Sequence, residues 1–152
     1  MKNTSVFSKK DINIYQPSYY ANNNPYNIEK FDCIYGDKNI YSTVRDLLLW
    51  DKALYSGSYI KHKTLQMAFE PNNNDKPSIH NYGLGWRMIN QANQKIIYHN
   101  GWWHGNNAVF TRFIKDTATI IVLGNRFNRN IYKAKNIAAS FLTGSDTTSV
   151  AE

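Results

Sequence analysis

From Tyr82 onward the hydrophobic residues follow a two-residue period, and this pattern restricts the fold more than any other feature of the sequence. Lys115 and Asp116 form a polar turn within this region. The succession of short alternating segments predicts an antiparallel meander of four strands. The predicted strands are Tyr82–Met88, Lys95–His99, Ala108–Ile114 and Thr119–Leu123.

Helical periodicity is found on both sides of the predicted sheet. Residues 42–55 carry a broad apolar face at helical spacing, and either Ser42 or Thr43 can cap the start of this helix. A shorter helix is predicted over Thr64–Phe69, and a third over residues 130–142. Helices, then an antiparallel sheet, then a helix packed on that sheet indicate an α+β fold.

The two ends of the chain are predicted to be less regular. Residues 1–30 are polar and rich in turn formers, with one short strand near Ser5–Phe7. An irregular stretch of this length is unusual in a compact domain and suggests that it covers another part of the structure. Residues 145–152 are expected to form a flexible tail. The chain is long enough for one hydrophobic core, so a single domain is predicted.

Composition narrows the possible functions. The formal net charge is +7, but the basic residues are scattered and form no nucleic-acid-binding signature, so no nucleic-acid partner is expected. The one cysteine, Cys33, excludes an internal disulfide and a multi-cysteine zinc site. No apolar run reaches membrane-spanning length, and the first residues form no signal-peptide core. We expect no metal, no cofactor and no membrane segment in this chain.

Residues 98–105, with the sequence Tyr-His-Asn-Gly-Trp-Trp-His-Gly, form the candidate functional site. The imidazole of His99 can accept or donate a proton near neutral pH. Gly101 allows a substrate to lie against the strand, and the next N–H, that of Trp102, can face a developing oxyanion. A surface turn with two histidines, His99 and His104, explains the cluster equally well. A metal site at these histidines lacks further ligands nearby.

Five short segments, spread over nearly the whole chain, occur in an order that carries a resemblance to a known family. Their sequences are Met-Lys-Asn-Thr, Tyr-Ser-Thr-Val-Arg-Asp-Leu-Leu-Leu-Trp, Tyr-Gly-Leu-Gly-Trp, His-Asn-Gly and Ile-Val-Leu-Gly-Asn, at residues 1–4, 41–50, 82–86, 99–101 and 121–125. The chain thus resembles, over nearly its whole length, the C-terminal part of the β-lactamase-like serine hydrolases, which include class C β-lactamases, penicillin-binding DD-peptidases and related esterases. The resemblance implies that residues 1–144 form the C-terminal portion of a β-lactamase and transpeptidase-like fold.

The resemblance also implies roles around the third motif of that family, Lys/His-x-Gly. His99 would hold the substrate and assist proton transfer, and the backbone N–H of Trp102 would supply half of the oxyanion hole. Asn100, Gly101 and Trp103 would contact the substrate, a small molecule or a peptide. Adjacent tryptophans point to opposite faces of a strand, so one is expected to pack inward and the other to line a cleft.

The family's nucleophile is the serine of a Ser-x-x-Lys motif, which we expect to lie before Met1 in a missing N-terminal half. Ser58 to Lys61 satisfies that pattern, and Tyr20 to Asn22 satisfies the family's Tyr-x-Asn motif. Their order is reversed relative to the family, so chance matches are expected.

The function expected from the resemblance is that of a C-terminal fragment of a serine acyl-transfer hydrolase, inactive alone. In the parent enzyme the substrate would be a β-lactam, a D-amino-acid peptide or an ester. The alternative is a degenerate, non-catalytic module that binds a partner chain or a cell-wall fragment. A parent of this family would be periplasmic or extracytoplasmic.

Overall fold

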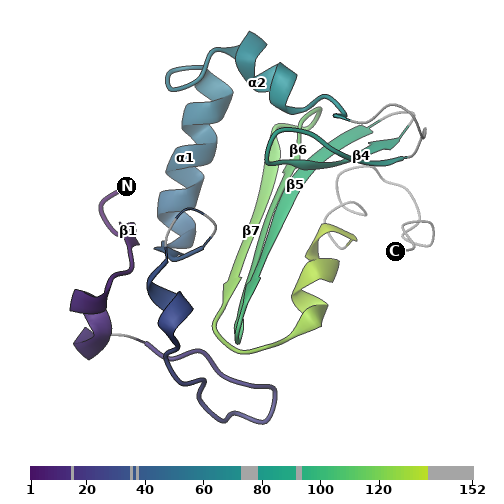
Figure 1. The fold of residues 1–152 in the computed structure, drawn as a ribbon. Helices are drawn as coiled ribbons and strands as arrows, with labels where there is room; N and C mark the ends of the chain where they lie inside the picture. The colour runs from purple at the N-terminus through teal and green to yellow at the C-terminus, as the bar shows by residue number, and fades with distance from the viewer. Residues whose placement is uncertain (15, 35, 37, 73–78, 92–93, 137–152) are drawn as a thin grey trace.

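The computed structural model describes residues 1–14, 16–34, 36, 38–72, 79–91 and 94–136 of the chain. Its centre is a five-stranded antiparallel sheet whose strands lie in sequence order (Figure 1). The strands are β3 (His80–Tyr82), β4 (Arg87–Gln91), β5 (Gln94–Trp103), β6 (Asn106–Phe113) and β7 (Ala118–Gly124). The predicted antiparallel meander is therefore confirmed.

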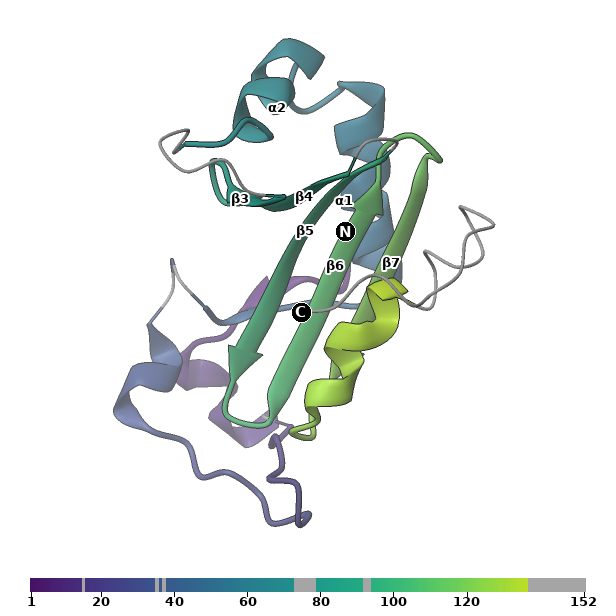
Figure 2. The same ribbon diagram turned by 90° about the vertical axis from the view of Figure 1, so that its right-hand side faces the viewer.

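Helices cover both faces of this sheet. The helices α1 (Val44–Ser56) and α2 (His62–Ala68) lie on one face, and the short 3-10 helix η3 (Arg129–Lys133) lies on the other (Figure 2). This arrangement confirms the predicted α+β class. Residues 134–136 continue from η3 as helix, whereas the rest of the helix predicted at 130–142 and the tail lie outside the described residues.

The N-terminal region consists of short elements that lie beside the sheet. They are β1 (Ser5–Val6), the 3-10 helices η1 (Lys9–Ile14) and η2 (Lys30–Cys33), and β2 (Ile40–Tyr41). Strand β1 pairs with β2 in a separate two-stranded sheet. The short strand predicted near Ser5 is therefore confirmed. None of the helices in the described part of the chain is both long and apolar enough to cross a membrane.

The start of α1 is set by its own sequence. The hydroxyl of Thr43 accepts a hydrogen bond from the backbone N–H of Asp46 at 3.1 Å, so Thr43 is the cap. The Asp46 carboxylate in turn accepts from the N–H of Asn3 at 2.7 Å and from the hydroxyl of Thr4 at 2.9 Å. The same turn that begins α1 therefore also fastens the first residues of the chain.

The predicted strand Tyr82–Met88 is wrong, because the chain turns between β3 and β4. The N–H of Gly83 donates to the carbonyl of Trp86 at 2.7 Å, and the N–H of Leu84 donates to the carbonyl of Ala68 at 3.0 Å. A Cβ atom on Gly83 would lie 2.2 Å from that Ala68 oxygen, so only glycine permits this approach to the end of α2. Apolar alternation alone does not distinguish one strand from two short strands joined by a glycine turn.

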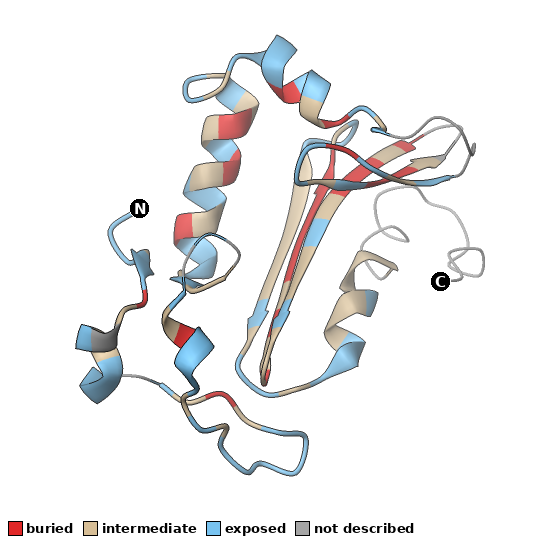
Figure 3. Ribbon diagram, viewed as in Figure 1, coloured by how far each residue is buried: buried red, intermediate tan, exposed pale blue. Residues whose placement is uncertain are grey.

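Each face of the sheet buries its own apolar cluster. The face toward α1 and α2 contains Leu54, Leu65, Phe69, Met88 and Ile97, and the opposite face contains Ile89, Ile96 and Phe113. Figure 3 shows that the buried residues concentrate in the central strands and in α1. Because alternate residues of a strand point to opposite faces, these clusters also establish which side chains of β5 face α1.

Candidate functional site

Strand β5 extends further than predicted, and its last residues have a strand partner on one side. Strand β4 pairs with β5 only as far as Arg87 opposite Tyr98, whereas β6 continues to pair until Asn106 lies opposite Trp103. Residues 99–103 of β5 therefore form an open edge on the β4 side within the described residues. Residues 98–103 of the candidate cluster thus belong to strand β5, whereas His104 and Gly105 form the turn that follows it.

The pairing pattern determines which backbone groups face this open edge. Trp103 and Asn106 flank a two-residue turn, so they form a hydrogen-bonded pair. Hydrogen-bonded and non-hydrogen-bonded pairs alternate along antiparallel strands. The N–H groups of Asn100 and Trp102 therefore point away from β6 and toward the open edge.

His99 lies at the start of the open edge with an exposed side chain. Its Nε2 atom is 3.2 Å from the hydroxyl oxygen of Tyr82, and the two rings meet edge to face. This contact was not foreseen, because the wrong strand prediction extended β3 through the turn that brings Tyr82 beside β5. The pair places a phenol and an imidazole at hydrogen-bonding distance beside the edge.

The buried carboxylate of Asp32, 71 positions before Trp103 in the sequence, contacts the end of the open edge that lies next to the β5–β6 turn. Asp32, in η2, accepts a hydrogen bond from the indole N–H of Trp103 at 2.5 Å, and the same oxygen lies 3.0 Å from Nε2 of His104. The second oxygen accepts from the N–H of Glu29 at 2.6 Å. Burial alone raises the pKa of Asp32, but these three groups outweigh burial and hold its pKa below the ordinary value. Asp32 therefore ties η2 to the β5–β6 hairpin as a carboxylate.

A hollow of about 270 Å³, here called the β5 hollow, adjoins the open edge. Residues 38–42, which include strand β2, form one wall of this hollow. The end of β5, the start of β6 and the end of β7 form the other wall. Its lining contains Gly101, Trp102 and Trp103 from the predicted site, whereas His99 and Asn100 lie outside that lining. The remaining lining residues are Lys38, Asn39, Ile40, Tyr41, Ser42, Asn106, Asn107, Ala108, Leu123 and Gly124.

The two adjacent tryptophans have different environments, as expected for opposite faces of a strand. The indole of Trp103 points toward Asp32, and the ammonium of Lys38 lies 4.3 Å from the centre of its ring. Trp102 is 65% exposed, and its ring contacts Phe127 at a centroid distance of 5.5 Å. Both tryptophans line the hollow. Trp103 is half-buried beside Asp32, and the indole N–H of the exposed Trp102 donates to the carbonyl of His104 at 2.9 Å.

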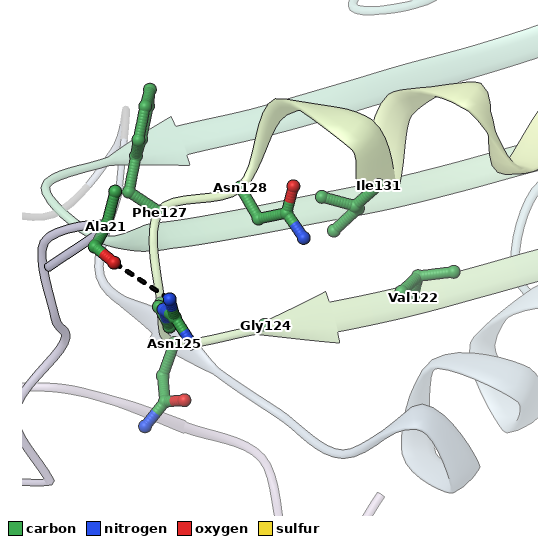
Figure 4. A pocket seen from close by; sticks show the side chains of 8 residues that line it. Ala21, Val122, Gly124, Asn125, Phe127, Asn128 and Ile131 are labelled. Carbon is green, nitrogen blue, oxygen red and sulfur yellow. Dashed lines mark hydrogen bonds between the residues drawn. The ribbon is translucent and has the colours of Figure 1, made fainter. Parts of the chain in front are cut away.

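A second hollow, of about 530 Å³, lies apart from this edge, between β7, η3 and the loop at Ala21 (Figure 4). Its one charged lining residue, Arg126, donates to the Ala21 carbonyl at 2.8 Å. The described lining holds no nucleophile and no acid, so this hollow offers no chemistry of its own.

Replacing Asp32 with asparagine is expected to lower the free energy of unfolding at pH 7 by about 1–3 kcal/mol, because a charged acceptor of three buried contacts is lost. The pKa of Asp32 is lower in the folded chain than its ordinary value of 3.8. Its stabilising contribution is therefore present above about pH 4 and is lost as the pH falls through the folded pKa. The difference between wild type and variant should shrink in that acidic range when urea unfolding is followed by circular dichroism.

The matched control is Glu70→Gln, which removes an exposed carboxylate that pairs with Lys95 at the surface. It should change the unfolding free energy by less than about 1 kcal/mol at any pH. An Asp32→Asn deficit that stays constant down to pH 3 would contradict the role assigned to the Asp32 charge.

Comparison with known proteins shows a relationship in sequence and in fold. No protein-family model matches the sequence. Penicillin-binding protein 4* of Bacillus subtilis (strain 168) is 30% identical over 110 residues, which cover 72% of this chain and 24% of that protein. The crystal structure of D-amino acid amidase from Ochrobactrum anthropi SV3, complexed with D-phenylalanine, is similar over 82% of this chain and 43% of its own, with a TM-score of 0.59 and 19% identity.

The chain thus spans about a quarter of the curated relative and less than half of the structural neighbour. The sequence relationship and the shared α+β fold confirm the resemblance drawn from the five ordered segments. The roles of individual residues at the edge stay predictions. The chain is a relative of the serine hydrolases of the penicillin-binding-protein and β-lactamase type, and shares with them the part of the fold described above.

Proposed function

We propose that this chain forms the substrate-binding strand and half of the oxyanion hole of a serine acyl-transfer hydrolase. The observation that carries this proposal is the open edge of β5, toward which the Trp102 N–H points. A substrate carbonyl lying along the edge would accept a hydrogen bond from this N–H. Donors aimed at a developing oxyanion are a major part of catalysis in acyl transfer.

The other predicted residues surround that position. His99 would hold the substrate and assist proton transfer, and Tyr82, 3.2 Å away, can orient its imidazole. Asn100 offers a second backbone N–H to the edge. Gly101 and Trp103 would contact the substrate group that enters the β5 hollow.

We propose that the nucleophile lies on a segment outside these 152 residues. The small share of the relative that the chain spans supports this placement. The internal candidate, Ser58, lies in the connection between α1 and α2, and this connection is at the opposite end of α1 from the β5–β6 hairpin (Figure 1). Its hydroxyl bonds to that of Ser56 at 2.8 Å, and no described hydrogen bond joins it to Lys61.

The names of the relatives support a substrate class. One binds penicillin, and the other is an amidase for D-amino acid derivatives. A β-lactam, a D-amino-acid peptide or amide, or a simple ester would each place a carbonyl along the open edge. The proposed reaction forms an acyl-enzyme on the external serine, which water or an amine then releases.

Two measurements test this function together. We expect the native gene product, captured by antibody, to be heavier than 17.6 kDa by intact mass spectrometry. A fluorophosphonate probe should label that product on a serine outside these residues and leave the isolated chain unlabelled. Labelling of the isolated chain that disappears in Ser58→Ala would place the nucleophile inside the chain instead. A 17.6 kDa product that binds muropeptides saturably without acylation would favour the non-catalytic binding module.

A further inference from the structure

The turn between β3 and β4 holds Tyr82 in a fixed position beside the open edge. Tyr82 pairs with Arg87 of β4, and its carbonyl accepts a hydrogen bond from the backbone N–H of Asn72 at 2.9 Å. The side-chain amide of Asn72 also donates to the carbonyl of Gly83 at 3.1 Å. Gly83 is itself held against the end of α2, where no residue with a Cβ atom fits. The backbone that carries Tyr82 is therefore fastened on both sides.

The contact between Tyr82 and His99 joins the last residue of β3 to the first residue of the open edge. The Tyr82 hydroxyl oxygen lies 3.2 Å from Nε2 of His99, and the two ring centres are 6.2 Å apart in an edge-to-face arrangement. The other ring nitrogen, Nδ1, takes part in no hydrogen bond with the described residues. In a neutral imidazole one nitrogen is a donor and the other an acceptor. The direction of the bond at Nε2 therefore determines what Nδ1 offers to a ligand.

A cation above the Tyr82 ring favours one direction for this hydrogen bond. The guanidinium carbon of Arg87 lies 5.4 Å from the ring centre, within the range of a cation–π contact. A phenol can donate or accept, but a nearby positive charge stabilises negative charge on its oxygen. The O–H of Tyr82 is therefore strengthened as a donor, and its oxygen is weakened as an acceptor. Nε2 of neutral His99 then accepts, and the proton of the ring lies on Nδ1.

We propose that Tyr82 is a positioning residue that fixes the tautomer of His99, so that neutral His99 meets the substrate as a hydrogen-bond donor through Nδ1. This inference rests on the proposed function, because that function is what places a substrate beside His99. The phenol occupies the lone pair on Nε2 that a general base would need. His99 therefore holds an oxygen atom of the substrate rather than removing a proton from it.

The ¹⁵N shifts of the two ring nitrogens of His99 test the tautomer, and His99→Gln assigns their signals. At about pH 9, where an imidazole is neutral, the wild-type chain should show a protonated Nδ1 and an unprotonated Nε2. Tyr82→Phe keeps the ring and removes the hydroxyl, so the proton should move largely to Nε2. The control Tyr98→Phe removes the hydroxyl of the neighbouring tyrosine, whose ring lies 5.1 Å from the Lys135 ammonium, and should leave the tautomer unchanged.

A second measurement, made in the longer native protein, follows acylation by a fluorophosphonate. Tyr82→Phe should acylate about tenfold more slowly, which is the loss expected for one neutral hydrogen bond. In a His99→Ala background the same substitution should have no further effect, because Tyr82 acts only through the imidazole. A purely structural role for Tyr82 would slow both backgrounds equally.

Several results would overturn the assignment. They are a wild-type His99 protonated on Nε2, a tautomer that stays the same in Tyr82→Phe, and a Tyr82→Phe enzyme that acylates at the wild-type rate. An equal loss of rate with and without the His99 imidazole would also overturn it. Failure of this proposal is distinguishable from failure of the proposed function, because the tautomer measurement needs no nucleophile, whereas the proposed function fails if no serine outside these residues is acylated.

Discussion

Arg112→Met is expected to lower the free energy of unfolding by about 3–5 kcal/mol, because it leaves a buried carboxylate without its cation. The Nε atom of Arg112 donates to Asp51 at 2.7 Å, and both side chains are almost completely buried. The other oxygen of Asp51 accepts from the Thr119 hydroxyl at 2.8 Å, and the guanidinium lies 4.2 Å from the ring centre of Tyr55. This cluster joins α1 to β6 and β7, so its loss affects the whole sheet.

Urea unfolding followed by circular dichroism measures this effect, and the double variant Asp51→Leu/Arg112→Met shows its origin. Removing both charges should restore much of the stability, since no buried charge then remains unpaired. Lys95→Met, which breaks the exposed pair with Glu70, is the control and should cost less than about 1 kcal/mol. A double variant as unstable as Arg112→Met would show that packing, rather than charge pairing, dominates at this position.

Trp102→Pro, made in the longer native protein, is expected to slow acylation by about 10²–10³-fold, because proline removes one donor of the oxyanion hole. The Trp102 N–H faces the open edge and takes no part in the β5–β6 ladder. Proline is tolerated in strands at such edge positions. The variant should therefore lose rate while keeping its fold. The rate of labelling by a fluorophosphonate measures acylation, and thermal unfolding measures whether the fold is kept.

Trp102→Ala separates the N–H from the side chain. It keeps the donor and removes an indole that is already largely exposed, so acylation should stay close to the wild-type rate. If Trp102→Pro acylates normally while folded, the N–H is not an oxyanion donor. If Trp102→Ala is as slow as Trp102→Pro, the indole rather than the backbone serves the reaction.

Features that depend on neighbouring residues were predictable without the structure. A helix start at Ser42 or Thr43 was predictable because a capping hydroxyl and the N–H group that it accepts from are only three residues apart in the sequence. In the structure Thr43 is the cap and α1 begins at Val44. Strands β5, β6 and β7 were recognised as short segments bounded by polar turns such as Lys115–Asp116. The opposite environments of Trp102 and Trp103 follow from the two-residue period of a strand once both belong to β5.

The candidate site was only partly predictable, because only some of its residues are neighbours in the sequence. The sequence placed His99, Gly101, Trp102 and Trp103 together because they lie within five consecutive positions. It did not reveal Tyr82 beside His99 or Lys38 over Trp103, since neither contact leaves a periodic signal.

Local sequence therefore determined the helical segment of α1, the strands β5 to β7 and the choice of residues 98–105 as the candidate site. The structure decided between Ser42 and Thr43 as the cap, and it placed a turn inside the predicted strand Tyr82–Met88.

The tertiary structure also decided that β4 stops pairing with β5 at Tyr98, whereas β6 pairs with β5 as far as Trp103. The N–H groups of Asn100 and Trp102 therefore remain at an open edge. The pairing of Asp32 with Trp103 and of Asp51 with Arg112 was likewise decided by the tertiary structure. Hydrophobic period reports which face of an element is buried, but register and long-range contacts depend on how the chain folds back on itself.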